Sequence, residues 1–165
     1  MDLIILRHGE AGKSMESAGA DFERALTVSG AIEVEEVVEA MGKLKLGINH
    51  VISSPLKRAN ETAIIAARGL KKEDLLELWD ELKPEGDTQD LYRRLSKLRQ
   101  DSVVLLVGHE PYLSGMIGEL ISGTKQARII LKKAGVARVE VTSLVPRPSG
   151  ELRWLLTPRQ MKKIA

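Results

Sequence analysis

The sequence of 165 residues contains no cysteine, which excludes disulfide bonds, thiolate catalysis and cysteine-ligated metal sites. Aromatic residues make up only 3% of the chain, so aliphatic side chains must fill the core. No basic run is interleaved with aromatic residues, which argues against a nucleic-acid-binding surface. With 43% hydrophobic residues and no low-complexity tract, the composition predicts a single domain over residues 1–165.

The sequence also lacks a recognisable membrane-targeting or membrane-spanning segment. Its start, Met1 to Arg7, holds an acid where a signal peptide needs basic residues, and its apolar run is too short. The longest aliphatic run, Val103 to Val107, has the length of a strand rather than of a membrane span. We therefore expect a cytoplasmic protein with no membrane partner.

The net charge is only +2, but it is unevenly distributed along the chain. Residues 1–82 carry 10 basic against 15 acidic side chains, and residues 83–165 carry 15 against 8. A basic surface in the second half would attract a phosphorylated or acidic partner. On composition alone, an ordinary solvated surface is the simpler interpretation.

Aliphatic runs and amphipathic segments alternate along the whole chain, a pattern typical of an α/β domain. The sequence predicts strands at 3–6, 50–53, within 75–82, 103–107, 136–141 and 152–156. It predicts helices at 28–46, from 55 toward 69, at 88–99 and from 111 to 122, with Ser54 as an N-cap and Pro55 at the first helical position. We expect a three-layer sandwich in which a mostly parallel central sheet has helices on both faces.

Two histidines and two arginines gather at one edge of this predicted sheet. Arg7 and His8 follow the first strand directly, and His109 follows the fourth. Arg58 lies in the first helical turn after the second strand, where unpaired N–H groups and the helix dipole favour an anion. Because ligands bind beyond the carboxyl ends of parallel strands, we expect these four side chains to surround a phosphate group.

Two further residues near these strands have different interpretations. Gly9 lets the backbone turn sharply after His8 and approach a bound anion. His50, the third histidine, begins the second strand and therefore lies at the opposite edge, where we expect no role. No acidic cluster with ligand spacing accompanies the histidines, so we expect neither a metal nor another cofactor.

The ordered motifs of this sequence resemble the histidine phosphatase superfamily, whose signature is an Arg-His-Gly tripeptide after the first strand. The resemblance covers nearly the whole chain, and the motifs that carry it are Arg7-His8-Gly9, Arg24 to Gly30 (which contains a Leu-Thr-x-x-Gly helix start), Ser54-Pro55 with Arg58 and Thr62, and Gly108-His109. It implies a phosphoglycerate mutase-like fold. It also implies a phosphatase in which His8 attacks phosphorus and is transiently phosphorylated.

The resemblance implies roles for the charged residues around His8. Arg7 and Arg58 would bind the phosphate oxygens, and their charges would keep His8 unprotonated at neutral pH. His109 would donate a further hydrogen bond to the phosphate. Arg24 could line the substrate entrance, although a surface ion pair explains this residue nearly as well.

The proton donor to the leaving group has two candidates. Glu81 lies where related enzymes keep an acid after the third strand, and we favour it modestly. Glu110 adjoins His109 at the head of its helix and is the rival. An ordinary surface glutamate is the alternative interpretation for both residues.

The spacing of the motifs favours one branch of the family. His109 follows Arg58 by 51 positions, whereas phosphoglycerate mutases carry a lid insertion in this interval. The compact form resembles the SixA-type phosphohistidine phosphatases, and an open pocket suits a phosphohistidine domain on a partner protein. Other short members act on phosphoserine or small phosphate esters, so these remain alternative substrates. A mutase and a non-catalytic phosphate-binding module remain alternative functions.

Overall fold

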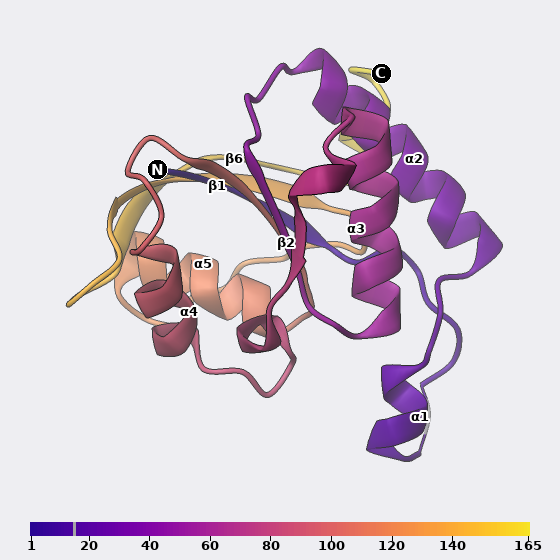
Figure 1. Cartoon of the computed structure of the whole chain (residues 1–165), viewed down its shortest axis with the longest axis horizontal. Helices are drawn as coiled ribbons and strands as arrows, with labels where there is room; N and C mark the ends of the chain where they lie inside the picture. Colours follow the sequence, from indigo (N-terminus) through magenta and orange to yellow (C-terminus); the bar gives the residue numbers. More distant parts are fainter. Residues whose placement is uncertain (15) are drawn as a thin grey trace.

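A six-stranded sheet forms the middle layer of the computed structural model, which describes residues 1–14 and 16–165 (Figure 1). The strands are β1 (Asp2–Arg7), β2 (His50–Ser53), β3 (Leu76–Leu78), β4 (Val103–Gly108), β5 (Val136–Ser143) and β6 (Ser149–Leu156). They lie in the order β3-β2-β4-β1-β5-β6. Strands β1 to β4 pair in parallel, and β5 and β6 are antiparallel additions at one edge. The expected α/β class and mostly parallel sheet are therefore confirmed.

Helices cover both faces of this sheet, as Figure 1 shows. The helices are α1 (Ala18–Phe22), α2 (Val28–Lys43), α3 (Lys57–Leu70), α4 (Thr88–Leu95), α5 (Tyr112–Ser122) and α6 (Pro158–Met161). Helices α2, α3 and α6 pack on one face, α4 and α5 pack on the other, and α1 projects from the body of the fold. Within the described residues, no helix has both the length and the apolarity needed to cross a membrane.

The strands at the centre of the sheet are buried on both faces. In β1, Leu3 and Ile5 belong to the core beneath α4 and α5, whereas Ile4 and Leu6 belong to the core beneath α2 and α3. Successive side chains of a strand point to opposite faces, so a strand covered on both sides needs an unbroken aliphatic run. This explains why the sequence pattern identified β1 and β4.

The parallel register brings three strand ends together. Arg7 of β1 lies opposite Gly108 of β4, and Ser53 of β2 lies opposite Val107 of β4. The residues that follow these strand ends are therefore neighbours, namely His8, Ser54 and His109. Backbone hydrogen bonds fix the arrangement, because the N–H of His8 donates to Gly108 O at 3.0 Å.

The start of α3 differs from the sequence prediction. The helix begins at Lys57 with Leu56 as its N-cap and no capping side chain, so the prediction of Ser54 as N-cap and Pro55 as first helical residue was wrong. Ser54 lies outside the helix, where its Oγ accepts a hydrogen bond from the N–H of Leu56 and contacts His109. Arg58 remains in the first turn of the helix because the boundary moved by only two residues.

Two other helices are shorter than their sequence patterns predict. Helix α2 ends at Lys43, before position 46, and α4 ends at Leu95, before position 99. The short third strand predicted within 75–82 is confirmed as β3, and the chain forms a short 3-10 helix, Asp80–Leu82, directly after Trp79. This 3-10 helix carries Glu81, one of the two candidate acids.

Candidate active site

His8 lies in the loop directly after β1, and its side chain is buried. Its Nδ1 is 2.7 Å from the carbonyl oxygen of Gly9. A carbonyl oxygen only accepts hydrogen bonds, so Nδ1 carries the proton and the lone pair of Nε2 is available. Burial lowers the pKa of His8 to about 4; the Gly9 hydrogen bond opposes this shift and the nearby arginines add to it. His8 is therefore neutral at pH 7, the state in which imidazole is a nucleophile.

His109 follows β4 and lies next to His8. The two ring centroids are 5.2 Å apart and the ring planes are tilted by 54°. Nε2 of His109 is 2.8 Å from Oγ of Ser54, and that oxygen also accepts a hydrogen bond from the backbone N–H of Leu56. If Ser54 donates its own proton to Nε2, the buried Nδ1 of His109 becomes a hydrogen-bond donor.

The environment of His109 also disfavours its charged form. Burial lowers the pKa of His109 to about 3, and the neighbouring His8 and the arginines add to the shift. A neutral His109 can donate only one ring N–H, and its direction is decided by the contact with Ser54. The serine is therefore a positioning residue for this histidine.

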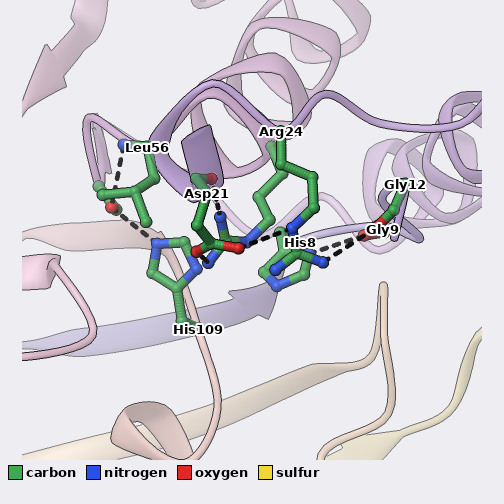
Figure 2. Close-up of polar contacts among 9 residues, drawn as sticks. His8, Gly9, Gly12, Asp21, Arg24, Leu56 and His109 are labelled. Carbon is green, nitrogen blue, oxygen red and sulfur yellow. Dashed lines mark hydrogen bonds and ion pairs between the residues drawn. The ribbon is translucent and has the colours of Figure 1, made fainter. Parts of the chain in front are cut away.

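Arg58 and Arg24 both contact the carboxylate of Asp21, and Figure 2 shows Asp21 beside Arg24. Arg58, buried in the first turn of α3, donates through Nη1 to the backbone oxygen of Asp21 at 3.0 Å. Its Nη2 lies 3.3 Å from Oδ2 of Asp21. Arg24 donates through Nε to Oδ1 of the same carboxylate at 2.9 Å and through Nη1 to the Gly12 carbonyl at 3.1 Å. The structure thus brings Arg24 to the site, where its charge acts on both histidines.

Three buried polar nitrogens of this region have no hydrogen-bond partner among the described residues. They are Nε of Arg7, Nε of Arg58 and Nδ1 of His109. Arg7 itself is anchored by Nη1, which donates to the backbone oxygen of Leu131 at 3.0 Å. Buried donors are normally paired, so the two arginine nitrogens, together with Nδ1 of His109 in the tautomer that protonates it, form the arrangement that an anion requires.

Gly9 packs closely against neighbouring elements of the fold. Its N–H donates to Oγ1 of Thr62 at 3.1 Å. A Cβ atom at this position would lie 2.7 Å from Cγ2 of Val34 and 3.0 Å from the carbonyl oxygen of Gly30. The glycine is therefore required for the loop to pack against α2, and its contact with an anion stays a prediction.

The two candidate acids have different surroundings. Both carboxylate oxygens of Glu81 accept hydrogen bonds from Nη1 of Arg94, at 2.9 and 3.1 Å, and Arg94 lies 3.9 Å above the ring of Trp79. In the described part of the chain, no hydrogen bond joins Glu81 to either site histidine. Glu110 accepts a hydrogen bond from the N–H of Ser114 at 2.8 Å, and its charge raises the pKa of Arg7 against the larger lowering effect of burial.

Sequence reasoning missed Asp21 and the contact of Ser54 with His109. Asp21 precedes Arg24 by three positions, and this helical spacing of opposite charges was the signal that could have identified the ion pair. Ser54 gave no separable signal, because a serine before Pro55 is typical of a helix start. His50 begins β2 at the edge away from the site, as expected. Across residues 1–14 and 16–165, no group of three His, Cys, Asp or Glu side chains could hold a metal ion.

Comparison with known proteins defines the class of this site. Residues 3–84 match the model of the histidine phosphatase superfamily, branch 1. The chain belongs to this superfamily, and its sequence, fold and relatives support a phosphatase activity. The resemblance inferred from the ordered motifs is therefore confirmed.

Within the superfamily, the chain is similar to SixA proteins over its whole length. It is 27% identical over 164 residues to the phosphohistidine phosphatase SixA of Escherichia coli K12, which covers 98% of this chain and 97% of that protein. The structure of the protein histidine phosphatase SixA complexed with tungstate gives a TM-score of 0.84 at 26% identity, over 96% of this chain and 98% of the other. A phosphoserine phosphatase of Entamoeba histolytica shares the fold, with a TM-score of 0.72 at 17% identity over 96% and 98% of the two chains.

Proposed function

We propose that this chain is a metal-independent phosphatase that works through a phosphohistidine intermediate on His8. The observation that carries the proposal is the pairing of a neutral, buried imidazole with unpaired buried donors at the same strand edge. The available Nε2 of His8 supplies the nucleophile. Arg7, Arg58 and His109 supply donors for the oxygens of a phosphoryl group.

The reaction follows from this arrangement in two steps. In the first, Nε2 of His8 forms a bond to phosphorus while the bond to the leaving group breaks, and the leaving group departs with a proton. In the second, water attacks the phosphorus of phospho-His8, which releases inorganic phosphate and restores the neutral histidine. Arg7 and Arg58 stabilise the phosphoryl oxygens in both steps, because guanidinium groups bind such oxygens in a fixed planar geometry.

We further propose that the substrate is phosphohistidine on a partner protein. Full-length similarity to the phosphohistidine phosphatase SixA supports this choice. The surroundings of the candidate acids support it as well, because Glu81 is held by Arg94 and Glu110 by a backbone N–H. An alkoxide leaving group depends on an acid, whereas the imidazole of a phosphohistidine has a second nitrogen that can be protonated near neutral pH.

A basic segment beside the site favours an acidic protein surface as partner. Residues 120–139 contain five basic and no acidic side chains. The segment is tied to the site by the bond from Arg7 to Leu131 O and by the bond from Ala134 N to His8 O. Lys132 and Lys133 are exposed there, and Ile130 is 73% exposed. Part of the excess positive charge of the second half of the chain therefore lies next to the proposed phosphate site.

The second candidate substrate is a small phosphate ester or phosphoserine. The shared fold of the Entamoeba phosphoserine phosphatase favours it, and Glu110, whose charge acts on Arg7, would then be the acid. A substrate panel separates the candidates: a phosphohistidine protein, phosphoserine and p-nitrophenyl phosphate, compared by kcat/KM. Preference for the phosphohistidine protein supports the proposal, and preference for phosphoserine assigns the enzyme to small esters.

Two controls complete this experiment. Activity that survives exhaustive chelation supports the metal-independent mechanism, and activity lost in chelator and restored by a divalent ion contradicts it. A His8→Ala variant that binds phosphate but turns nothing over argues against a non-catalytic binding module for the wild type. The cytoplasmic location stays a prediction from the sequence.

A further inference from the structure

The carboxylate of Asp21 occupies donors of two arginines at the proposed phosphate site. It accepts from Nε of Arg24 at 2.9 Å and lies 3.3 Å from Nη2 of Arg58, whose Nη1 donates to the backbone oxygen of the same aspartate. Figure 2 shows Asp21 between the Arg24 side chain and the ring of His109 in this view. The Asp21 carboxylate therefore already neutralises part of the positive charge of the two arginines that a phosphoryl group would bind.

A carboxylate and a phosphate compete for the same guanidinium donors. Both anions accept parallel hydrogen bonds from the planar fork of arginine. Arg58 is only 4% exposed, so water screens its interactions weakly, and a bound phosphate dianion close to the Asp21 carboxylate would be repelled. Asp21 and a phosphoryl group therefore cannot both make their best contacts with Arg58.

Helix α1, which carries Asp21, is weakly attached to the core. None of the residues of α1 is buried, and the side chain of Asp21 is 26% exposed. The base of the segment is held more firmly, by the bridge between Ala11 and Leu26 and by the bond from Gly12 N to Ala25 O. A rotation of the Asp21 side chain, or a shift of α1, would release the arginines without opening the core.

We propose that Asp21 is a built-in competitor of phosphate at this site. In the free enzyme, its carboxylate neutralises and orients Arg58 and Arg24; a phosphoryl group displaces it on binding, and it returns when inorganic phosphate leaves. Asp21 thus limits the affinity for the product and keeps the site from being blocked by phosphate. This inference rests on the proposed function, because it requires Arg58 to bind the phosphoryl group.

The alternative role for Asp21 is to position the arginines for phosphate. The two roles predict opposite signs for the neutral, nearly isosteric variant Asp21→Asn. Loss of a competitor tightens anion binding, whereas loss of a positioning contact weakens it. The sign of one binding constant therefore decides between them.

The experiment is calorimetric titration with tungstate and with inorganic phosphate, which needs no turnover. We expect Asp21→Asn to bind both anions about five- to tenfold more tightly than the wild type, the effect of one nearby unit charge at a partly exposed site. Asp21→Ala, which also lacks the charge, should bind more tightly too. The matched control is Glu23→Gln, an exposed carboxylate two residues away, which should change binding less than about twofold because solvent screens it.

Kinetics give a second readout with a distinct signature. In Asp21→Asn, we expect a lower KM for p-nitrophenyl phosphate, stronger inhibition by inorganic phosphate and a lower kcat, because the product is held longer. Unchanged or weaker anion binding by both Asp21 variants overturns this inference alone. Tungstate binding that is insensitive to Arg58→Ala overturns the proposed function, and this inference with it.

Discussion

The polar groups beyond the carboxyl ends of the central strands, β1 and β4, differ from those beyond the edge strand β3 in whether they have hydrogen-bond partners. At the ends of β1 and β4 and at the start of α3, buried donors of Arg7, Arg58 and His109 lack partners among the described residues. After β3, Glu81 and Arg94 satisfy one another, and the guanidinium lies on Trp79. Over the residues that the structure describes, the centre leaves buried nitrogens without a partner, whereas Glu81 and Arg94 at the edge are only partly buried and pair with one another.

This difference shows how a binding site can be distinguished from a structural ion pair. A paired carboxylate and guanidinium gain little from a further ligand, because the new contact must first break the old one. Unpaired buried donors are costly in the free protein, and an anion that binds them removes this cost.

The largest effect is expected at the nucleophile. His8→Ala should reduce turnover of every substrate by roughly a thousandfold or more, because no other group can carry the phosphoryl intermediate. Rapid quenching of the wild type should trap an acid-labile, alkali-stable phosphoryl adduct that is absent in His8→Ala. An adduct retained in the variant would assign the nucleophile elsewhere.

The arginines of the two regions form a matched pair of variants. Arg58→Gln should reduce kcat/KM by about 10²- to 10³-fold, the usual loss for one donor to a transition-state oxyanion. Arg94→Gln should reduce it by less than about tenfold, because its partners are Glu81 and Trp79. Similar losses of kcat/KM in both variants, with unchanged folding by circular dichroism, would contradict the distinction between Arg58 as a phosphate ligand and Arg94 as part of a structural ion pair.

The buried histidines should make the protein sensitive to acid. The pKa of His8 is about 4 in the folded protein against an ordinary value of 6.5, so the unfolded chain binds more protons below pH 6.5. The free energy of unfolding should therefore fall as the pH drops from 6.5 toward 4, by on the order of 2 kcal/mol from this residue.

A urea titration measures this contribution. His8→Asn should show a smaller loss of stability between pH 6.5 and pH 4.5 than the wild type, since it lacks the group that must stay neutral on folding. The two proteins should have parallel profiles above pH 7, where the histidine is neutral in both states. Equal losses below pH 6.5 would contradict the lowered pKa.

The smallest effect is expected at Glu81, whose oxygens are already occupied. Glu81→Gln should leave cleavage of a phosphohistidine protein within about tenfold of the wild type, and cleavage of p-nitrophenyl phosphate as well. Glu110→Gln is the matched comparison. A large loss on unactivated esters in Glu81→Gln alone would establish Glu81 as the acid, and a large loss in Glu110→Gln alone would transfer that role to Glu110.

Sequence reasoning located the four central residues of the site better than the contacts of the candidate acid Glu81. The positions of Arg7, His8, Arg58 and His109 followed from where aliphatic runs end, because a parallel sheet places all such ends at one edge. The contacts of Glu81 depend on a side chain from another element. Arg94, on α4, follows Glu81 by 13 positions, and no periodicity predicts that contact.

Local patterns and spacing were enough to predict the six strands, helices α2 to α5, the buried character of β1 and β4, and the residue types at the strand ends. The pairing of the polar atoms was set by the packing of these elements against one another. This packing turned Ser54 toward His109, left Nε of Arg58 without a partner among the described residues and set Asp21 against two arginines. The reason is physical: whether a buried group is satisfied depends on partners from other elements, and the packing of those elements fixes their distance and direction.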